Sequence, residues 1–512
     1  MSCILAQYTI RSKQDYIFRS NQVLEIIGAS DHITRSWDVL LAQAKKAGLK
    51  VCSLTDHKPF EMESVQKSFA EKTLNLVELF RGGGNDTILF DSMDSYRLAN
   101  QQFSRYLLEE FPGMIPMAVC CECTGDYKKD YQNLIAEAEM EKNRMISGQS
   151  SFILPFSMMD RNSFQPFSRV VHYGTETVRL TEENYAKRNT GRKVRDTKND
   201  VNDVKILDNM VTKRGEESLL AVIHADGNNM GSKISSMLGD CADYNVCVQK
   251  MREFTADTAN AFVTEGLEAL EQCKENLQKR YKEKYKEKYN SMFNDGSFSC
   301  RNIISDGDDM TFICNARFAM DYVKAYLESV QNYQKRHNSE WAYSSCAGIC
   351  IFHGHYPFAR AYSMAEQACD DGAKKKVHIE GKIIEEGWVD FHYIHSGIGG
   401  NLVSIRDHQG TAERMARPWL VTGGAEDREE HFSQLMKLDE LLKTYHVART
   451  DVKTLGSEYE SSTSEGEKEL NRICGHHKGL EKELKQSFGD KNRLLKTIYD
   501  LSEVYDLWFK TV

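Results

Sequence analysis

Two short acidic stretches carry the side chains best suited to chemistry in this sequence. The first, Ser305–Asp309, contains Asp306-Gly307-Asp308-Asp309 and lies between two apolar runs, 302–304 and 310–314. An Asp-Gly pair between apolar runs favours a tight β-hairpin, because Gly readily adopts the positive φ that the turn requires. We therefore expect the carboxylates of Asp308 and Asp309 just past a hairpin tip, close to solvent and to a ligand.

The second stretch follows a predicted buried strand. Residues 219–225 are almost entirely apolar, and Asp226 comes directly after them, before a Gly-containing turn and a helix. We expect Asp226 to meet the hairpin carboxylates and to hold Mg²⁺ or Mn²⁺ with them, because magnesium prefers hard oxygen ligands. Two such ions, about 3.5–4 Å apart, neutralise the charge that grows during transfer to an α-phosphate. Side chains alternate along a strand, so at most one of Asp308 and Asp309 ligates directly unless a bulge intervenes.

The residues after Asp226 suit a triphosphate. Gly227 and Gly231 would let backbone N–H groups approach phosphate oxygens, and the N-terminus of the next helix favours an anion. Lys374, which follows a predicted helix, could neutralise the outer phosphates. Gly227 also belongs to the predicted metal site. The predicted nucleotide-binding residues in these segments are Gly227, Asn228, Asn229, Met230, Gly231, Ser232, Gly307 and Lys374.

Each of these features has a plainer explanation when it stands alone. Asp306-Gly307 is most often just a turn, His224 a core histidine, and Lys374–Lys376 a solvated helix end. The catalytic interpretation rests on their combination in the correct order and on the correct predicted elements.

Composition limits the class of protein. The chain has 512 residues, 41% of them hydrophobic and 28% charged, as in ordinary globular proteins of several domains. Its net charge of −9 argues against a surface built to wrap nucleic acid, so any RNA contact must be a local basic patch. No apolar stretch approaches the roughly 20 residues that span a bilayer, and the N-terminus lacks the pattern of a signal peptide. We expect a cytoplasmic protein with no membrane partner and with reduced cysteines.

A zinc site is not favoured by the spacing of the cysteines. Cys120 and Cys123 form one Cys-x-x-Cys pair, but a zinc site needs a second pair and none follows at a suitable distance. Buried or strand-end thiols explain these residues better.

The first 125 residues have the pattern of a small α+β domain. Strands are predicted at 3–10, 50–54 and 117–121, with helices between them and another around 95–110. A hairpin is predicted at Gly82–Asp86. Gly28–Ser30 is interpreted as a break between two helices, with Ser30 as an N-cap. The polar segment 187–213 is predicted to be a mobile linker.

The same pattern recurs after residue 216. A strand at 218–225, a helix after it, a hairpin at 299–314, a helix at 316–334 and a strand at 344–352 give the order β-α-β-β-α-β of a ferredoxin-like palm, with a closing strand at 389–393. We predict an α+β protein with two ferredoxin-like palm domains, duplicated, plus a C-terminal helical domain. The predicted domains are 1–125, the first, degenerate palm; 126–215, a connecting region; 216–398, the catalytic palm; and 399–512, a helical bundle.

A long helical insert is predicted at 251–289. Its end alternates Lys, Glu and Tyr, from Lys279 to Tyr289. A solvated helix with i,i+4 ion pairs is the plainer interpretation, and a nucleic-acid patch with stacking tyrosines is the alternative.

The motifs resemble a known family. Asp226–Gly231, the Asp306–Asp309 hairpin and Ala373-Lys374 are similar to the large polymerase-cyclase subunit of type III CRISPR effector complexes. Tyr16–Asn21 with Glu25–Ser30 looks like the first palm of that family. The resemblance covers roughly 1–125 and 216–395. It implies that two ATP molecules bind between the palms and are joined through 3′–5′ linkages into cyclic oligoadenylates, second messengers of antiviral defence.

Three departures from the family pattern matter. Asp306 replaces the first Gly of the family's Gly-Gly-Asp-Asp hairpin, although both metal-binding acids remain. The first palm has Gln7-Tyr8 where the second has Ala225-Asp226, so we expect it to lack a complete metal site and to hold a second nucleotide. The residues expected to do so are Gly28, Ala29, Ser30, Gly83, Gly84, Asn85 and Asp86. No N-terminal His-Asp nuclease domain is recognised, and DNA cleavage is not expected.

Three functions are compatible with these residues. The first is a metal-dependent nucleotidyltransferase that joins ATP, or other NTPs, with release of pyrophosphate. The second is a catalytically silent, nucleotide-binding scaffold of an RNA-guided effector complex, with RNA and other subunits as partners. The third is a mononucleotide cyclase on the same palm. These residues do not indicate which base is used, the ring size of the product or the activator.

Overall fold

The structure is a computed structural model of the chain. None of the helices within the part it describes is long and apolar enough to cross a membrane. The described residues are 3–20, 22–56, 59–145, 156–161, 163–173, 175–197, 210–212, 218–239, 241, 243–294, 296–379, 382–395 and 400–509.

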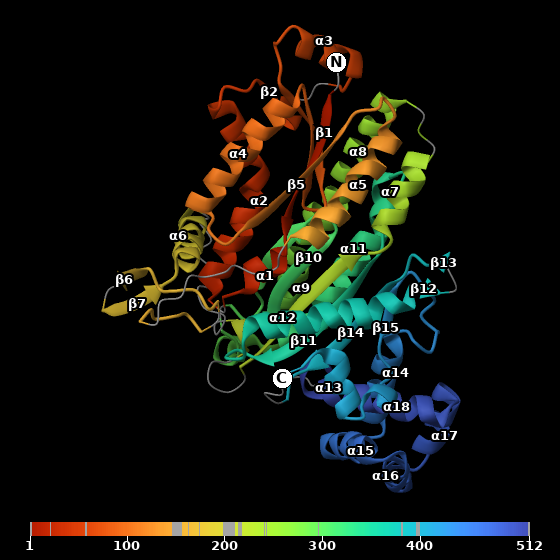
Figure 1. The fold of residues 1–512 in the computed structure, drawn as a ribbon. Helices are drawn as coiled ribbons and strands as arrows, with labels where there is room; N and C mark the ends of the chain where they lie inside the picture. The colour runs from red at the N-terminus through yellow and green to blue at the C-terminus, as the bar shows by residue number, and fades with distance from the viewer. Residues whose placement is uncertain are drawn as a thin grey trace. The chain divides into compact units, whose positions relative to one another are not determined.

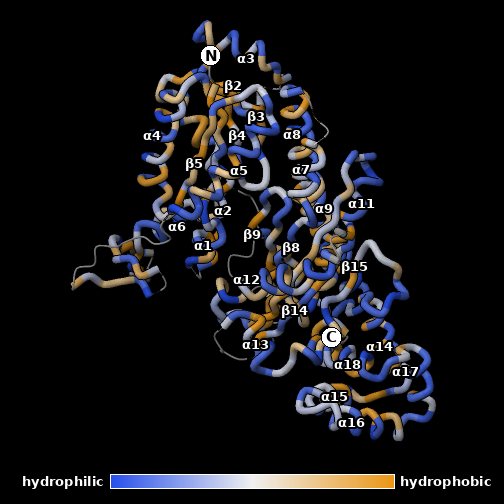
Figure 2. Tube along the Cα trace, turned by 45° about the vertical axis from the view of Figure 1, so that its right-hand side comes forward, coloured by the Kyte–Doolittle hydropathy of each residue, from blue (hydrophilic) through white to orange (hydrophobic). Residues whose placement is uncertain are grey.

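The chain forms two compact units, each assembled from several segments. The first comprises residues 1–203, 229–263 and 303–308. The second comprises residues 204–228, 264–302 and 309–512. In Figure 2 the hydrophobic residues concentrate along the strands inside each unit, and the outer helices carry mostly hydrophilic residues.

The first unit is built on a five-stranded mixed sheet of order β2-β3-β4-β1-β5. β1 pairs antiparallel with β4 and β5, whereas β2 and β3 run parallel. The hairpin predicted at 82–86 is confirmed, and its two turn residues, Gly83 and Gly84, have φ of 57° and 68°. The strands are β1 Ile4–Arg11, β2 Val51–Cys52, β3 Leu76–Gly82, β4 Asn85–Phe90 and β5 Ile115–Glu122.

Helices cover both faces of this sheet. Figure 1 shows α2 and α4 on one side and α5 and α8 on the other. Tyr8 lies between the sheet and α4, with ring centroids 6.3 Å from Tyr96 and 6.4 Å from Phe103. A separate two-stranded sheet, β6 Arg169–Tyr173 and β7 Glu176–Leu180, precedes α6. The helices are α1 Lys13–Phe18, α2 Val23–Lys46, α3 Met62–Ala70, α4 Met93–Glu110, α5 Tyr127–Arg144, α6 Glu182–Thr197, α7 Met230–Gly239 and α8 Tyr244–Ala259.

The predicted break at Gly28–Ser30 is wrong, because α2 runs through it without interruption. A Cβ on Gly28 would lie 2.6 Å from the carbonyl carbon of Lys187 and 2.9 Å from the amide nitrogen of Gly191. Gly28 therefore serves a close crossing of α2 and α6, a contact between segments far apart in the sequence. Ser30 is not an N-cap; its hydroxyl donates to the carbonyl of Ile303.

The predicted mobile linker is also wrong over 187–197, which belongs to α6. Lys187 is fully buried, pairs with Glu183 one turn earlier and donates to the carbonyl of Tyr16. Lys and Glu four residues apart lie on one helix face, so a segment that reads as polar can be buried if its charges pair. The rest of that prediction, 198–209 and 213, lies outside the described residues.

The second unit is built on a six-stranded mixed sheet of order β15-β14-β11-β8-β10-β9. β8 pairs antiparallel with β10 and β11, and β11 pairs parallel with β14. The predicted hairpin at 299–314 is confirmed as β9 and β10. The strands are β8 Leu219–Gly227, β9 Cys300–Asp306, β10 Asp309–Asn315, β11 Ser345–His353, β14 Gly387–Tyr393 and β15 Trp419–Thr422, with a small separate pair β12 His378–Ile379 and β13 Lys382–Ile383.

The long insert is not one helix. It comprises α8, a π-helical turn at Asn260–Thr264 and α9 Glu265–Tyr285. Tyr281 and Tyr289 lie 5.6 and 5.9 Å from Phe298 between ring centroids, so these tyrosines pack internally rather than present stacking faces. The solvated-helix interpretation is favoured. Further elements are α10 Tyr289–Met292, α11 Ala319–His337, α12 Phe358–Gln367, a π turn Ala368–Gly372 and a 3₁₀ turn Ala373–Lys376.

The C-terminal region is largely helical, as predicted, with two differences. β15 adds to the edge of the second sheet, where it pairs with β14. The helical stretch 463–488 is divided into two helices near Gly479, whose φ of 92° ends regular helix geometry. The helices are α13 Leu402–His408, α14 Ser433–Thr444, α15 Arg449–Ser461, α16 Thr463–His476, α17 Leu480–Phe488 and α18 Lys491–Val504.

The α2–α6 crossing gives a first testable prediction. Gly28→Ala should lower the free energy of unfolding by about 1–3 kcal/mol, because the added methyl group forces two helix backbones apart. Gly475→Ala is the matched control, since no atom lies within 4 Å of its added Cβ. It should leave stability unchanged or raise it by up to about 1 kcal/mol. Urea unfolding of the full chain measures both; equal effects of the two variants would contradict the packing argument.

A second prediction concerns His32, which is fully buried between the Tyr16 hydroxyl and Thr190 and stacks on Phe111 at 4.0 Å. Burial lowers the pKa of His32 from its usual 6.5 to about 3. Between those values the unfolded chain binds a proton that the folded chain does not. Stability should therefore fall as the pH drops below 6.5, by up to about 1.4 kcal/mol per pH unit. Urea unfolding across this range should show a shallower slope for His32→Gln than for the wild type; equal slopes would contradict it.

Candidate functional site

The register between β8 and β10 brings two of the predicted acids together. Asp226 and Asp309 are directly opposite partners in an antiparallel pair. Directly opposite residues project from the same face, with Cβ atoms about 4.5–5.5 Å apart. Asp308 lies instead in the turn, beside Gly307 with its φ of 66°. The strand pairing therefore makes Asp226 and Asp309, rather than Asp308, the neighbouring carboxylates.

Lys374, which lies 148 residues after Asp226 in the sequence, completes this cluster. Its ammonium group forms an ion pair with Asp226 Oδ2 and lies 3.9 Å from Asp370 Oδ1. Burial, the largest single influence, would lower the pKa of Lys374, but the combined attraction and hydrogen bond of Asp226, with the attraction of Cys369 and Asp370, raises the pKa overall. The acid pair thus already attracts a positive charge.

His224 belongs to the same cluster, although the sequence analysis interpreted it as a core histidine. Its Nδ1 lies 3.4 Å from Asp309 Oδ1 and 3.4 Å from the hydroxyl of Thr311. Burial lowers the pKa of His224, which favours the neutral ring. The one available signal was alternation: two residues before Asp226, His224 must share its face of the strand.

The predicted phosphate loop has a buried and an exposed part. Asn228 is 2% exposed, and its side-chain amide donates to the Ser344 hydroxyl and to the Glu386 carbonyl. These bonds fix the end of β8. In the first unit, Gly231 and Ser232 are exposed in the first turn of α7, and Asn229 just before it has φ of 62°.

The residues predicted for the first palm have different surroundings. Gly28 and Ala29 lie inside the α2 packing described above, and Asp86 is fully buried in β4, opposite Tyr8. Burial, reinforced by Glu78, raises the pKa of Asp86 well above its usual value. Gly83, Gly84 and Asn85 form the turn and its exit.

The turn of the first hairpin packs closely against residues 306–307, which belong to the same compact unit. Lys13 Nζ lies 2.8 Å from Asp306 Oδ2. A Cβ on Gly84 would lie 2.6 Å from Lys13 Cε, and one on Gly307 would lie 2.8 Å from the Gly83 nitrogen. The acid that departs from the family hairpin pattern therefore has a dedicated cationic partner.

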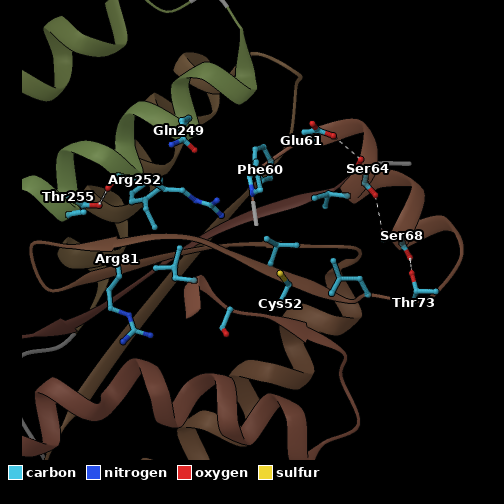
Figure 3. A pocket seen from close by; sticks show the side chains of 18 of the residues that line it. Cys52, Phe60, Glu61, Ser64, Ser68, Thr73, Arg81, Gln249, Arg252 and Thr255 are labelled. Atoms are coloured by element: carbon cyan, nitrogen blue, oxygen red, sulfur yellow. Dashed lines mark hydrogen bonds between the residues drawn. The ribbon is translucent and has the colours of Figure 1, made fainter. Parts of the chain in front are cut away.

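A cavity of about 1080 Å³ lies elsewhere in the first unit, between β3, α3 and α8 (Figure 3). Arg252 and Phe60 lie on one side of it and Arg81 on the other (Figure 3). None of the predicted site residues lines this cavity. The acid–lysine cluster, where charge and strand register converge, is the stronger functional candidate.

Comparison with known proteins identifies the second palm. Residues 219–380 match the family described as Cas10/Cmr2, second palm domain. This segment contains Asp226, the Asp306–Asp309 hairpin and Lys374, on which the sequence resemblance rested. Residues 219–380 thus match the family that the sequence resemblance indicated, and the resemblance is confirmed over this segment.

Solved structures give weaker similarities. A Csm1–Csm4 cassette in complex with pppApApA has a TM-score of 0.48 and 12% identity, over 98% of this chain and 69% of that one. Csm1 of T. onnurineus has a TM-score of 0.46 and 13% identity, over 98% of this chain and 69% of that one. A type III-B Cmr-β complex in its apo state has a TM-score of 0.48 and 10% identity, over 99% of this chain and 82% of that one. At these scores the similarities carry no functional conclusion. No curated protein matches the chain.

The Lys374–Asp226 pair yields a third prediction. If Asp226 holds a metal ion and Lys374 a phosphate, as the sequence predicts, Lys374→Met should strengthen Mn²⁺ binding, because it removes a cation that competes for Asp226, and should weaken ATP binding. A hydrogen bond to a charged group contributes about 1.5–3 kcal/mol, so changes of roughly 10- to 100-fold are expected.

Electron paramagnetic resonance of free Mn²⁺ and fluorescence of a labelled ATP measure the two affinities. Lys375→Met is the matched control, since that side chain is 66% exposed and pairs with Asp371. Affinities that move in the same direction, or a control that behaves like Lys374→Met, would contradict the prediction.

Proposed function

We propose that the protein is a metal-dependent nucleotidyltransferase that joins ATP, or other NTPs, into cyclic oligonucleotides. The observation that carries the proposal is the pairing of Asp226 with Asp309 in a segment that matches a Cas10/Cmr2 second palm. The proposal includes the interpretation of the two sheets as duplicated ferredoxin-like palms. It is supported by equivalent strand orders, β5-β1-β4-β3 and β11-β8-β10-β9, which both follow the order 4-1-3-2 along their own segments.

The donor atoms of the acid pair fit Mg²⁺ or Mn²⁺. Asp226 and Asp309 offer hard carboxylate oxygens from one face of the sheet, and the Lys374 ammonium bound to Asp226 supports the proposal that a cation is held here. Asp226 and Asp309, with Gly227 and Asp308 as predicted further contributors, would hold the metal. When bound, it would neutralise the charge that develops on the reacting phosphate.

The reaction in this proposal is an in-line displacement. The 3′-hydroxyl oxygen of one nucleotide forms a bond to the α-phosphorus of another, the bond to the β-phosphate oxygen breaks, and pyrophosphate leaves. The hydroxyl proton passes to solvent. Such a transfer depends mainly on positioning and electrostatics, so few side chains need to act as acid or base.

The remaining residues of the site have positioning roles in this proposal. Lys374 exchanges Asp226 for the outer phosphates of the bound nucleotide, since the ammonium group can pair with either anion. Gly231 and Ser232, exposed residues at the start of α7 in the first unit, keep their predicted role as backbone donors to a phosphate. His224 faces Asp309 and holds the orientation of its carboxylate.

The family setting extends the proposal to partners. Members of the resembling family work in RNA-guided complexes, so we propose RNA and other effector-complex subunits as partners and antiviral defence as the setting. The first palm, which carries Gln7-Tyr8 at the position of Ala225-Asp226, would bind a second nucleotide without a complete metal site of its own.

The experiment is an incubation of the pure protein with ATP and Mg²⁺ or Mn²⁺, with and without RNA. Pyrophosphate release and a mass spectrum of the products are measured for the wild type, Asp226→Asn and Asp309→Asn. Both variants should lose at least about 10²-fold in rate, the size of effect seen when a major electrostatic stabiliser is removed. Asp94→Asn is the control, since its side chain is 95% exposed in the first unit.

The outcomes separate the three candidate functions. Oligomeric products abolished in both variants support the proposal, and a cyclic mononucleotide would favour the mononucleotide cyclase instead. ATP binding without pyrophosphate release under every condition would overturn the enzyme proposal in favour of the silent scaffold.

A further inference from the structure

We propose that His224, Cys369 and Asp370 form a second metal site, for a borderline-soft divalent ion of the Zn²⁺ class. Each residue offers one ligand atom, and the three atoms all lie within 4.8 Å of one another. Ligands at the usual distances of about 2.0–2.3 Å from one zinc ion are separated by less than this, so a small closure of the cluster would suffice. The proposal concerns a site different from the Asp226–Asp309 pair and does not rest on nucleotidyl transfer.

A glycine in the sheet allows His224 and Cys369 to lie close together. Gly348 in β11 lies directly opposite His224 in β8. A Cβ at Gly348 would lie 2.5 Å from the amide nitrogen of Cys369 and 3.0 Å from the carbonyl carbon of Ala365. Only a residue without a side chain lets the end of α12 approach the sheet so closely. Cys369, itself fully buried, is thereby held against the face that carries His224.

A local change of helix type positions the other two ligands. α12 ends at Gln367, and residues Ala368–Gly372 form a π-helical turn that contains both Cys369 and Asp370. Single π turns are rare and often occur at functional sites, because the wider turn redirects side chains. Here Cys369 points into the core, whereas Asp370 remains 53% exposed. The site therefore has a buried side and an open side.

The donor atoms select the kind of metal. One sulfur, one imidazole nitrogen and one carboxylate oxygen suit Zn²⁺ or Co²⁺, whereas Mg²⁺ prefers oxygen alone. Three protein ligands leave a fourth position for water or a substrate group, as in catalytic rather than closed structural zinc sites.

The surroundings of His224 fit a metal ligand. Nδ1 faces the Asp309 carboxylate and the Thr311 hydroxyl, and among the described residues no hydrogen bond reaches Nε2. A ligating histidine usually directs its other nitrogen to a carboxylate, which fixes the tautomer. Nε2 is then the nitrogen for the metal.

The thiol must lose its proton when the metal binds. Cys369 Sγ lies 3.4 Å from the Cys346 carbonyl, to which it donates, and burial raises its pKa. Binding therefore exchanges an S–H bond for a metal–sulfur bond and releases one proton to solvent for each ion bound. An ion there would hold His224 against Asp309; that consequence for catalysis, unlike the site itself, rests on the proposed function.

The test is a Co²⁺ titration of the full chain without nucleotide, followed by near-ultraviolet absorption. Thiolate–cobalt coordination gives a charge-transfer band, and we expect it to saturate at one equivalent and to be displaced by Zn²⁺. Cys369→Ala should abolish the band. Asp370→Asn should weaken binding at least about tenfold, and its partly exposed position keeps the fold intact. Cys350→Ala, at another fully buried cysteine of β11, is the control and should keep the band.

The outcomes are distinct from those of the nucleotide experiment. Absence of the band in the wild type, or its persistence in a folded Cys369→Ala protein, would overturn the site. If Cys369→Ala does not fold, an unchanged affinity in Asp370→Asn would overturn it instead. A band together with no pyrophosphate release would support the metal site while the proposed enzyme function fails, and activity with Mg²⁺ without a band would give the reverse.

Discussion

The pairing register of β8 with β10 is the constraint on which the candidate site depends. Asp226 and Asp309 come from strands separated by more than eighty residues of sequence, yet the register makes them direct neighbours on one face. A shift of one residue would move an entire strand's side chains to the other face, so the site cannot tolerate slippage. Buried apolar residues on both strands, such as Ile223 and Phe312, make such a shift costly. The packed core therefore protects the chemistry at its edge.

Two groups of buried charges in this protein are compensated by neighbouring charges of opposite sign. Lys187 is fully buried with Glu183, and Arg417 is buried between Asp500 and Glu503. Removing one member of such a group leaves a buried charge without compensation, which destabilises more than the pair itself stabilises. The acid–lysine cluster differs in being partly exposed, with Asp226 27% and Lys374 21% accessible. Its charges can therefore exchange partners, as binding of an anionic ligand and a cation requires.

Local patterns were sufficient to predict most of the strands and both hairpins. The turn at Gly83-Gly84 and the apolar runs around Asp306-Gly307 follow from backbone preference and alternation, which are properties of neighbouring residues. Gly28 was misread as a helix break because the contact that requires a glycine there is made with α6, a segment more than 150 residues away. Lys187 was misread as part of a linker for the same reason: the carbonyl of Tyr16, to which it donates in the folded chain, lies 171 residues earlier in the sequence. β15 was missed because a four-residue edge strand within a helical region has little pattern of its own.

The acids of the candidate site could be predicted from the sequence, whereas the residues that pack beside them could not. Asp226 and Lys374 stand out through residue type and position after predicted elements, and their family is confirmed over 219–380. His224, Cys369 and Gly348 have no distinctive local signal, since their proximity arises only when β8, β11 and α12 assemble. The close approach of the two turns, at Gly84 and Gly307, has a further consequence for how this sequence can change. A side chain added at Gly84 would meet the Lys13–Asp306 pair, and one added at Gly307 would meet the backbone of Gly83. Substitutions in the two turns are therefore not independent of each other. We therefore expect a substitution at Gly84 or Gly307 to be tolerated only together with a compensating change in the other turn.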